Sequence, residues 1–321
     1  MKITKISNDF TPLRQGILFG IETETEEPTD LVVEIINSTS GEVVATQLLR
    51  SVIEAQVNIA PYIQPFSERT PSQQWRSTIQ DAPIVTHHIR IGDTLSESIK
   101  TSFNTEVVTL PSLVSTMPSS RRISRDERDE LLLMVGAGKR LLVEIVTSTN
   151  DGDNLRHTTE TGVAVVSFNP SMYDADSTYA DIKISCDDEL IGTLHYDIVP
   201  YLNGSLRLAW LSECGSIERY TLPAVVSTKR QATKQTIRTL EGRRVVRSST
   251  EHRISATSRY EPRVIAEALA YIASLPKVWL EEEEGLSEVV VTTSTIDNKL
   301  FNEPDCVNLE LLVWRREEVL C

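Results

Sequence analysis

Closely spaced cysteines are missing from this sequence. The four cysteines of the 321-residue chain are scattered, and no two of them form a Cys-x-x-Cys pair. The sequence therefore indicates neither a disulfide framework nor a zinc site, and we expect ordinary reduced thiols. The four positions are Cys186, Cys214, Cys306 and Cys321.

Long hydrophobic runs are missing as well. No apolar stretch approaches the roughly 20 residues that a membrane-spanning helix needs, although hydrophobic residues make up 40% of the chain. Residues 1–9 contain two lysines with no apolar stretch behind them, so they fail as a secretory signal. We expect a protein that is made and kept in the cytoplasm, does not contact a membrane and has room for two or three cores.

Catalytic motifs are also absent. The five histidines show no His-Glu-x-x-His or His-x-His spacing, and no Gly-x-Ser-x-Gly elbow occurs. Gly136–Lys139 looks like part of a phosphate loop, but Leu133 replaces its first Gly and Arg140 its Ser or Thr. We interpret this segment as a hairpin turn between strands at 130–135 and 141–146. The sequence predicts a protein that is not an enzyme and has no cofactor, although scattered residues can also catalyse reactions.

Two acidic runs raise the question of a metal. Asn150–Asn154 places oxygen ligands at the density of a calcium-binding loop, but the distant bidentate Glu of an EF-hand is missing. Glu281–Glu284 precedes Gly285 and is typical of a solvated turn. We predict no resident metal and leave open an opportunistic cation at the first run.

Charge is distributed unevenly along the chain. The net charge of −14 argues against general nucleic-acid binding, which needs a dense Lys and Arg footprint. Residues 229–263 nevertheless contain ten Lys or Arg against three Glu, a local balance of +7 that leaves −21 for the rest. These cations either line two solvated strand faces or form a basic face that docks on an acidic neighbouring copy or faces nucleic acid. The candidate interface residues are Arg238, Arg243, Arg244, Arg247, Arg253 and Arg259.

A short internal echo is the main sign of architecture. Asn58–Ile63 returns 139 positions later as Asp197–Leu202, and each copy follows a strand-turn-strand pattern. Pro61-Tyr62 and Pro200-Tyr201 stand where a strand should end, because proline cannot donate to a strand ladder. We expect each tyrosine to close one end of a sandwich core and to play no catalytic part.

These patterns predict a mainly β protein with two related antiparallel β-sandwich-like modules and a C-terminal α+β part. We place the first module at 1–65, an extended polar arm or insertion at 66–120, the second module at 121–228 and the C-terminal domain at 229–321. The segment 66–120 is rich in Ser, Thr, Pro and Gln, and so long a polar stretch is unusual inside a compact domain.

The C-terminal domain has a distinct pattern. Strands at 245–246 and 252–260 precede Glu261-Pro262, which begins a helix whose apolar face runs from Val264 to Ile272. Further strands at 277–280, 289–295 and 307–314 follow Pro276. The order is therefore β-β-α-β-β-β, which is typical of an antiparallel sheet with one helix against it.

Leu206–Leu222, with Trp210-Leu211-Ser212 followed by Gly215, resembles a signature of virion proteins from tailed phages and prophages of Bacteroides-type gut bacteria. The run Ser274–Leu280 is similar to a strand entry in the same family, and the resemblance covers about residues 180–315. Ser212 and Leu222 depart from the Asn and Phe that are usual there, and Arg219 stands where an aromatic residue is common. In physical terms, Trp210 anchors a core and Gly215 permits a turn.

The resemblance implies a structural component of a phage tail or neck, located in the virion and assembled in the host cytoplasm. Such a subunit would form a homo-oligomeric ring or an adaptor and would contact tail tube, neck or fibre proteins. A ring uses heterologous contacts between different patches of one chain, and complementary charge can fix their register. The alternatives are a cell-surface adhesin or carbohydrate-binding β-sandwich and, third, a hydrolase with dispersed acids.

Overall fold

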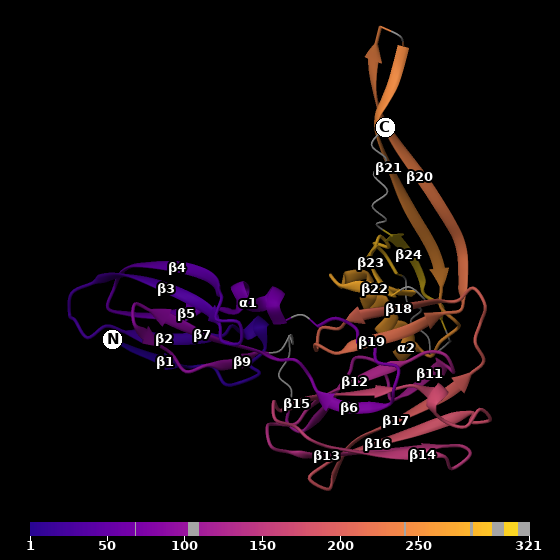
Figure 1. The fold of residues 1–321 in the computed structure, drawn as a ribbon, viewed down its shortest axis with the longest axis horizontal. Helices are drawn as coiled ribbons and strands as arrows, with labels where there is room; N and C mark the ends of the chain where they lie inside the picture. Colours follow the sequence, from indigo (N-terminus) through magenta and orange to yellow (C-terminus); the bar gives the residue numbers. More distant parts are fainter. Residues whose placement is uncertain (68, 102–108, 241, 283–284, 297–304, 314–321) are drawn as a thin grey trace.

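The computed structural model describes all residues except 68, 102–108, 241, 283–284, 297–304 and 314–321. The chain is mainly β, with several largely antiparallel sheets and β-sandwich character, as the sequence predicts. A sandwich at the N-terminus lies beside a body made of a second sandwich and a C-terminal sheet, and a long hairpin rises from that body (Figure 1). No helix in the described residues is long and apolar enough to cross a membrane.

The N-terminal sandwich packs two sheets around one core. Alternate side chains of neighbouring strands point inward, among them Phe19 and Ile21 on one sheet and Val33 and Ile35 on the other. One sheet has the order β1 (Lys2–Lys5), β2 (Leu18–Glu22), β5 (Glu54–Asn58). The other has the order β4 (Val43–Val52), β3 (Thr29–Asn37), β7 (Val85–Ile91), β8 (Thr94–Leu95), with β9 (Ile99–Thr101) also paired to β7.

The second sandwich repeats the two-sheet architecture with a different topology. Its core includes Phe168 and Tyr196, whose ring centroids are 4.9 Å apart, and β11 pairs with β17 in parallel. One sheet has the order β10 (Ser112–Val114), β12 (Asp129–Met134), β15 (Val163–Phe168), β6 (Thr78–Asp81). The other has the order β11 (Ser120–Ser124), β17 (Glu189–Val199), β16 (Tyr179–Cys186), β13 (Arg140–Thr147), β14 (Gly152–Thr158).

The C-terminal part is a seven-stranded sheet with one helix against it. The sheet order is β19 (Ile217–Leu222), β18 (Leu206–Leu211), β22 (Val278–Glu282), β23 (Gly285–Val291), β24 (Asn308–Val313), β21 (Gly242–Thr257), β20 (Ala224–Thr239). The prediction of two strands at 245–246 and 252–260 is wrong, because both fall mostly within the single strand β21, and the strand that precedes it is β20. Helix α2 (Arg263–Ala270) covers the core, and Ala266 and Leu269 are buried against the sheet. Short 3-10 turns are η1 (Leu13–Gln15), η2 (Pro170–Met172) and η3 (Tyr271–Ser274).

The predicted arm at 66–120 is wrong for the described residues. β6 joins the second sandwich by pairing with β15, whereas β7 to β9 belong to the N-terminal sandwich. The chain crosses between the modules because each needs strands from this segment to complete a sheet. The polar composition concealed β6 and β9, which have only four and three residues.

Two other predicted boundaries also differ from the structure. The end of the second module at 228 is wrong, because β18 and β19 belong to the C-terminal sheet, where β18 pairs with β22. The turn at Gly136–Lys139 is not a hairpin, because β12 and β13 belong to opposite sheets of the second sandwich. Gly136 and Gly138 have positive φ angles of 93° and 78°, which suit this change of sheet.

The two Pro-Tyr pairs are not equivalent in space. Pro61 lies in the first turn of helix α1 (Ala60–Ser67), whereas Pro200 follows β17 in a loop. Tyr62 and Tyr201 are 38% and 55% exposed, so the prediction that they close the sandwich cores is wrong. The neighbouring Ile59 is fully buried and occupies that core instead. The predictions for Trp210, which is buried, and for Gly215, which has a φ of 83°, are confirmed.

Candidate functional site

The long hairpin of β20 and β21 is the main candidate interface. Each strand has 16 residues, and the ribbon rises away from the body (Figure 1). In the described part of the chain β21 pairs with β24 only between His252 and Thr257. From the Gln231–Glu251 pair toward the tip the ribbon is two-stranded, and we call residues 231–251 the arm. A two-stranded ribbon by itself is only marginally stable in water.

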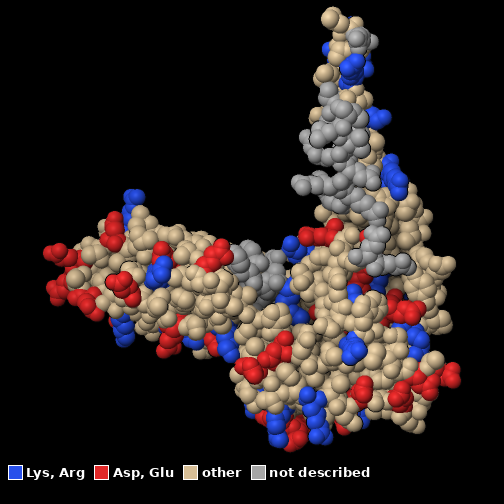
Figure 2. Space-filling model, viewed as in Figure 1, with Lys and Arg blue, Asp and Glu red and all other residues tan. Residues whose placement is uncertain are grey.

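Basic side chains lie on both faces of the arm. Cross-strand partners point to the same face of a ribbon, and two pairs of the hairpin are both cationic, one at its base and one near its tip. Lys229 lies opposite Arg253, and Arg238 lies opposite Arg243. Residues 226–238 are all exposed, and Figure 2 shows the Lys and Arg side chains along the ribbon. Like charges in opposite positions cost stability, so the arm presents a positive surface that an anionic partner would favour.

The predicted interface residues occupy different parts of this hairpin. Arg238, Arg243 and Arg244 lie near the tip and are exposed. Arg247 is in β21, but its side chain lies outside the described residues. Arg253 lies at the base, where it forms an exposed salt bridge of 3.1 Å with Glu251.

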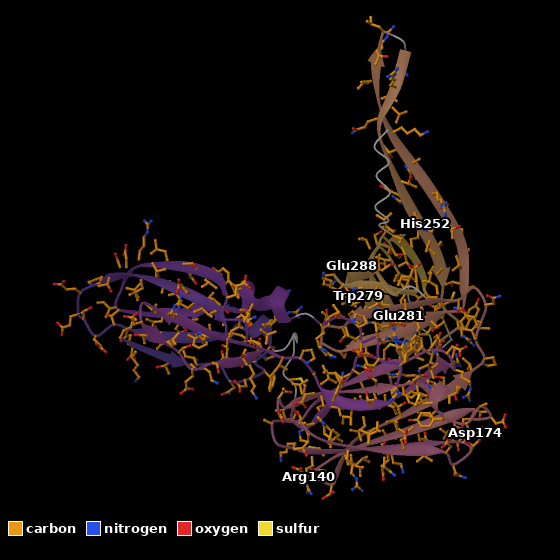
Figure 3. The ribbon with its side chains drawn as sticks, in the orientation of Figure 1. Arg140, Asp174, His252, Trp279, Glu281 and Glu288 are labelled. Carbon is orange, nitrogen blue, oxygen red and sulfur yellow. The ribbon has the colours of Figure 1, made fainter. Side chains whose placement is uncertain are left out.

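Arg259 belongs to the body rather than the arm. It follows β21, is partly buried, and its backbone N–H donates to the Tyr220 hydroxyl at 3.3 Å. His252 marks the base of the hairpin in Figure 3. Most of the described side chains of the arm are exposed, which both interpretations of the basic segment require, and the docking function remains a prediction.

Apolar side chains are exposed close to the tip. Ile237 is half-exposed, Leu240 is fully exposed, and Val245 lies on the opposite strand with part of its surface open. They add an apolar contact to the positive charge. A small apolar contact surrounded by charged groups is typical of a protein interface.

A second cluster, which the sequence did not predict, joins the second sandwich to the C-terminal sheet. Arg207 on β18 donates to Glu127 at 2.9 Å and to Glu281 on β22 at 3.2 Å. Its Nη1 also donates to the Thr221 hydroxyl at 2.8 Å, and that hydroxyl donates to Glu127 at 2.6 Å. Trp279 and Glu281 lie two residues apart on β22 (Figure 3), so both face the joint.

Arg219 on β19 lies at the centre of the joint. Its side chain is fully buried and contacts Glu281 at 2.8 Å and Glu130 on β12 at 3.3 Å. Glu130 also binds Arg69 at 3.3 Å and accepts from the backbone N–H of Ser72 at 2.8 Å. The segment before β6, which contains Arg69 and Ser72, therefore binds the same carboxylate as β19 of the C-terminal sheet.

The electrostatics of the joint keep these groups charged. Burial acts to lower the pKa of Arg219, but the charges of Glu130 and Glu281 outweigh burial and raise that pKa. Burial acts to raise the pKa of Glu281, but Arg219 and Arg207 outweigh it and hold that pKa below its usual value. A buried ion pair depends on its partner, since removal of one member leaves an uncompensated charge.

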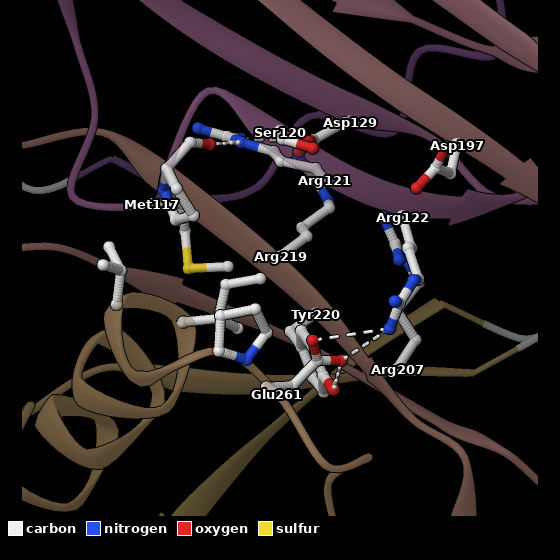
Figure 4. Close-up of a pocket in the computed structure, with 14 residues that line it drawn as sticks. Met117, Ser120, Arg121, Arg122, Asp129, Asp197, Arg207, Arg219, Tyr220 and Glu261 are labelled. Atoms are coloured by element: carbon white, nitrogen blue, oxygen red, sulfur yellow. Dashed lines mark hydrogen bonds and ion pairs between the residues drawn. The ribbon is translucent and has the colours of Figure 1, made fainter. Parts of the chain in front are cut away.

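A cavity of about 260 Å³ opens beside this joint (Figure 4). Its apolar side includes Met117 and Ile265, and its polar side includes four arginines. Arg122 contacts Glu261 at 3.2 Å, and the Tyr220 hydroxyl donates to the same carboxylate at 2.8 Å. The other three arginines also have carboxylate partners: Arg121 with Asp129 and Glu218, Arg207 with Glu127 and Glu281, and Arg219 with Glu130 and Glu281. The charges of the cavity are thus matched internally, which fits a structural joint.

No group of three His, Cys, Asp or Glu that could hold a metal is found among the described residues. The carboxylates of the predicted cation loop accept hydrogen bonds from their own chain. Asp151 accepts from the backbone N–H of Asp174 at 2.9 Å, and Asp153 accepts from the Tyr173 hydroxyl at 3.2 Å.

Comparisons with known proteins give no family. No family model matches the chain, and no curated protein matches it. Solved structures similar to it include the chicken CNTN1 FN1–FN3 domains, with a TM-score of 0.22, 11% identity and coverage of 80% of this chain and 91% of that one. Another is a tetra-tandem repeat from the extending region of a large adhesion protein, with a TM-score of 0.21, 10% identity and coverage of 96% and 80%. Similarity this low carries no argument about function.

Proposed function

We propose that this chain is a non-enzymatic structural subunit that assembles with copies of itself through its arm. The observation that carries this proposal is the arm, an exposed positive ribbon that projects beyond the body. The cross-strand pair of Arg238 and Arg243 weakens the isolated ribbon, and an acidic surface would offset that repulsion. Such an element is suited to an intermolecular contact.

The rest of the same chain offers the opposite charge. It carries −21 when the 229–263 segment is set aside. Figure 2 shows acidic side chains at the far end of the N-terminal sandwich, where the exposed loop between β2 and β3 contains Glu24, Glu26 and Glu27. An arm-to-body contact is heterologous, and repetition of such a contact gives a ring when the rotation closes.

The setting that we propose is the tail or neck of a phage virion. The resemblance of Leu206–Leu222 to virion proteins supports it, and a rigid joint between two β modules suits a subunit that must keep its shape in an assembly. A ring or adaptor in this position would also contact other virion proteins.

The first test is the absolute mass of the purified protein by light scattering across a concentration series, followed by negative-stain imaging. The matched variant reverses Arg243, Arg244 and Arg247 to Glu. The control reverses three exposed cations outside the arm, Arg76, Arg156 and Lys183. We expect defined oligomers for the wild type and the control, and at least a tenfold weaker association for the arm variant.

Other results would change the assignment. A wild-type protein that stays monomeric at every concentration, or an arm variant that assembles like the wild type, would overturn the proposal. Duplex DNA that binds to the wild type with steep salt dependence, and not to the arm variant, would assign the arm to nucleic acid. Binding on a glycan array would favour the adhesin alternative.

A further inference from the structure

The edge of the N-terminal sandwich has an unusual strand. β4 is the terminal strand of its sheet and pairs only with β3 in the described part of the chain. Its ten residues contain one charge, Arg50, and no Lys or Pro. Natural sheets protect long edges with charge, proline or short length, because an open edge can pair with another strand. Of these protections β4 has only Arg50 near its end, and its pairing with β3 is shifted in register near each end, between Thr29 and Leu31 and between Ile35 and Ile36.

The other terminal strands of the described sheets are protected or short, apart from β20. β14 has seven residues and carries Asp153 and Arg156, and β11 has five residues and carries Arg121 and Arg122. β20 has 16 residues and is the terminal strand of the C-terminal sheet. The two long terminal strands of this protein are therefore β4 and β20.

An exposed apolar pair lies beside the open edge. Val32 on β3 and Leu48 on β4 are directly opposite each other, and each is 51% exposed. Cross-strand neighbours on one face form a continuous surface. A strand that adds to β4 would extend this surface and could cover Leu48 with an aliphatic side chain such as Ile237 of the arm.

The charges around the two strands are complementary. Residues 22–54, which contain the β3–β4 hairpin, have eight acidic residues and one basic residue, a balance of −7. The arm, residues 231–251, has five basic residues and two acidic residues, a balance of +3. Charge complementarity of this kind steers encounter and selects the register of an interface.

We propose, on the basis of the self-assembly proposed above, that the outer edge of β20 in the arm of one copy adds to β4 of a neighbouring copy. Main-chain hydrogen bonds between the strands supply the contact, as in other cases of β-strand addition, and the opposite charges orient it. The N-terminal sandwich and the arm project in different directions from the body (Figure 1). The arm therefore meets the β4 of another copy and not its own.

The first test uses proline at two consecutive positions of β4. Neighbouring residues of a strand direct their backbone N–H groups to opposite sides, so one of Thr46 and Gln47 faces β3 and the other faces the open edge. Thr46→Pro and Gln47→Pro are made separately, and folding is measured by circular dichroism and thermal unfolding. We expect the variant that keeps its fold to associate at least tenfold more weakly than the wild type.

The second test is cross-linking, which applies even if neither proline variant folds. Thr46→Cys protein is mixed with Ala232→Cys or Thr236→Cys protein under assembly conditions, oxidised, and mapped by mass spectrometry for disulfide-linked peptides. Thr158→Cys, on the protected terminal strand β14, is the matched control. We expect links from residue 46 to the arm, none from residue 158, and loss of the links in high salt.

The outcomes separate this inference from the proposed function. Suppose that the arm reversal dissociates the oligomer, but the folded proline variant assembles normally and no link to residue 46 forms. The arm then docks on another surface, and the β4 inference is wrong. If the arm reversal also leaves self-association unchanged, the proposed role of the arm is wrong as well.

Discussion

Arg238 lies directly opposite Arg243 near the tip of the arm, so two cations share one face of a two-stranded ribbon. This pair costs the isolated hairpin stability. We predict that Arg238→Glu, which creates an opposite-charge pair, stabilises the ribbon by roughly 0.2–1 kcal/mol and weakens self-association. Hydrogen exchange of the arm amides measures the stability of the ribbon, and light scattering across a concentration series measures self-association.

Arg238→Gln is the matched control, because it removes one charge without creating an attraction. We expect it to fall between the wild type and Arg238→Glu in both measurements. A variant with a more protected arm and unchanged association would show that these cations do not contact a partner.

The second prediction concerns the joint. Glu281→Ala removes the carboxylate shared by Arg207 and Arg219, which lies 3.2 Å from the first and 2.8 Å from the second. Loss of one member of a buried ion pair typically costs roughly 3–5 kcal/mol, and urea unfolding of the purified protein measures it. Limited proteolysis should then cut between the second sandwich and the C-terminal sheet.

Glu251→Ala is the surface comparison for that experiment. Glu251 pairs with Arg253, and both side chains are more than 40% exposed. Exposed pairs contribute about 0–1 kcal/mol, so this variant should unfold like the wild type. If both variants lose the same free energy of unfolding, the buried ion pairs of the joint do not contribute more to stability than an exposed pair, and the prediction is wrong.

The third prediction concerns acid stability of the N-terminal sandwich. His87 on β7 is fully buried, and burial, with a smaller effect from His88, lowers its pKa from 6.5 to about 4. Its Nδ1 lies 3.3 Å from the Thr101 hydroxyl. Between about pH 6.5 and pH 4 the unfolded chain binds this proton more readily than the folded one. Stability is therefore lost as the pH falls through that window.

Urea unfolding at pH 7 and pH 4.5 tests the role of His87. We expect this residue to account for a loss of roughly 2 kcal/mol on acidification, and His87→Leu to remove that part of the loss. His252→Leu, at the base of the arm, is the control and should keep the wild-type difference between the two pH values. Identical pH dependence in the wild type and His87→Leu would show that other groups control the acid transition.

Local patterns were sufficient for the parts of the fold that depend on neighbouring residues. The apolar spacing after Pro262 predicted the helix that the structure has as α2, and the strand predicted at 141–146 lies within β13. Trp210 was recognised as a core residue because it is large and apolar within a strand pattern. Each of these inferences uses residues that are close in sequence.

Strand partnership could not be predicted in the same way. β6 closes a sheet with β15, more than 80 residues away, and no local signal selects that partner. The joint is equally nonlocal, since Arg219 and Glu130 come from different modules. A charged residue at an inward position of an apolar strand was the available signal: Arg219 lies between Ile217 and Leu222 in β19, and Glu130 precedes Leu131 in β12.

The last prediction compares two aromatic residues, each of which the sequence assigned to a core. Trp210 is buried and Tyr201 is 55% exposed. Trp210→Ala should destabilise the C-terminal sheet by roughly 3–5 kcal/mol, because it leaves a cavity among Leu208, Leu280 and their neighbours. Tyr201→Ala should change the free energy of unfolding by less than about 0.5 kcal/mol, as is usual at the surface. Urea titrations followed by circular dichroism measure both. A large loss for Tyr201→Ala would mean that its ring is covered in solution, and the comparison of monomeric with assembled protein would then show whether a neighbouring copy covers it.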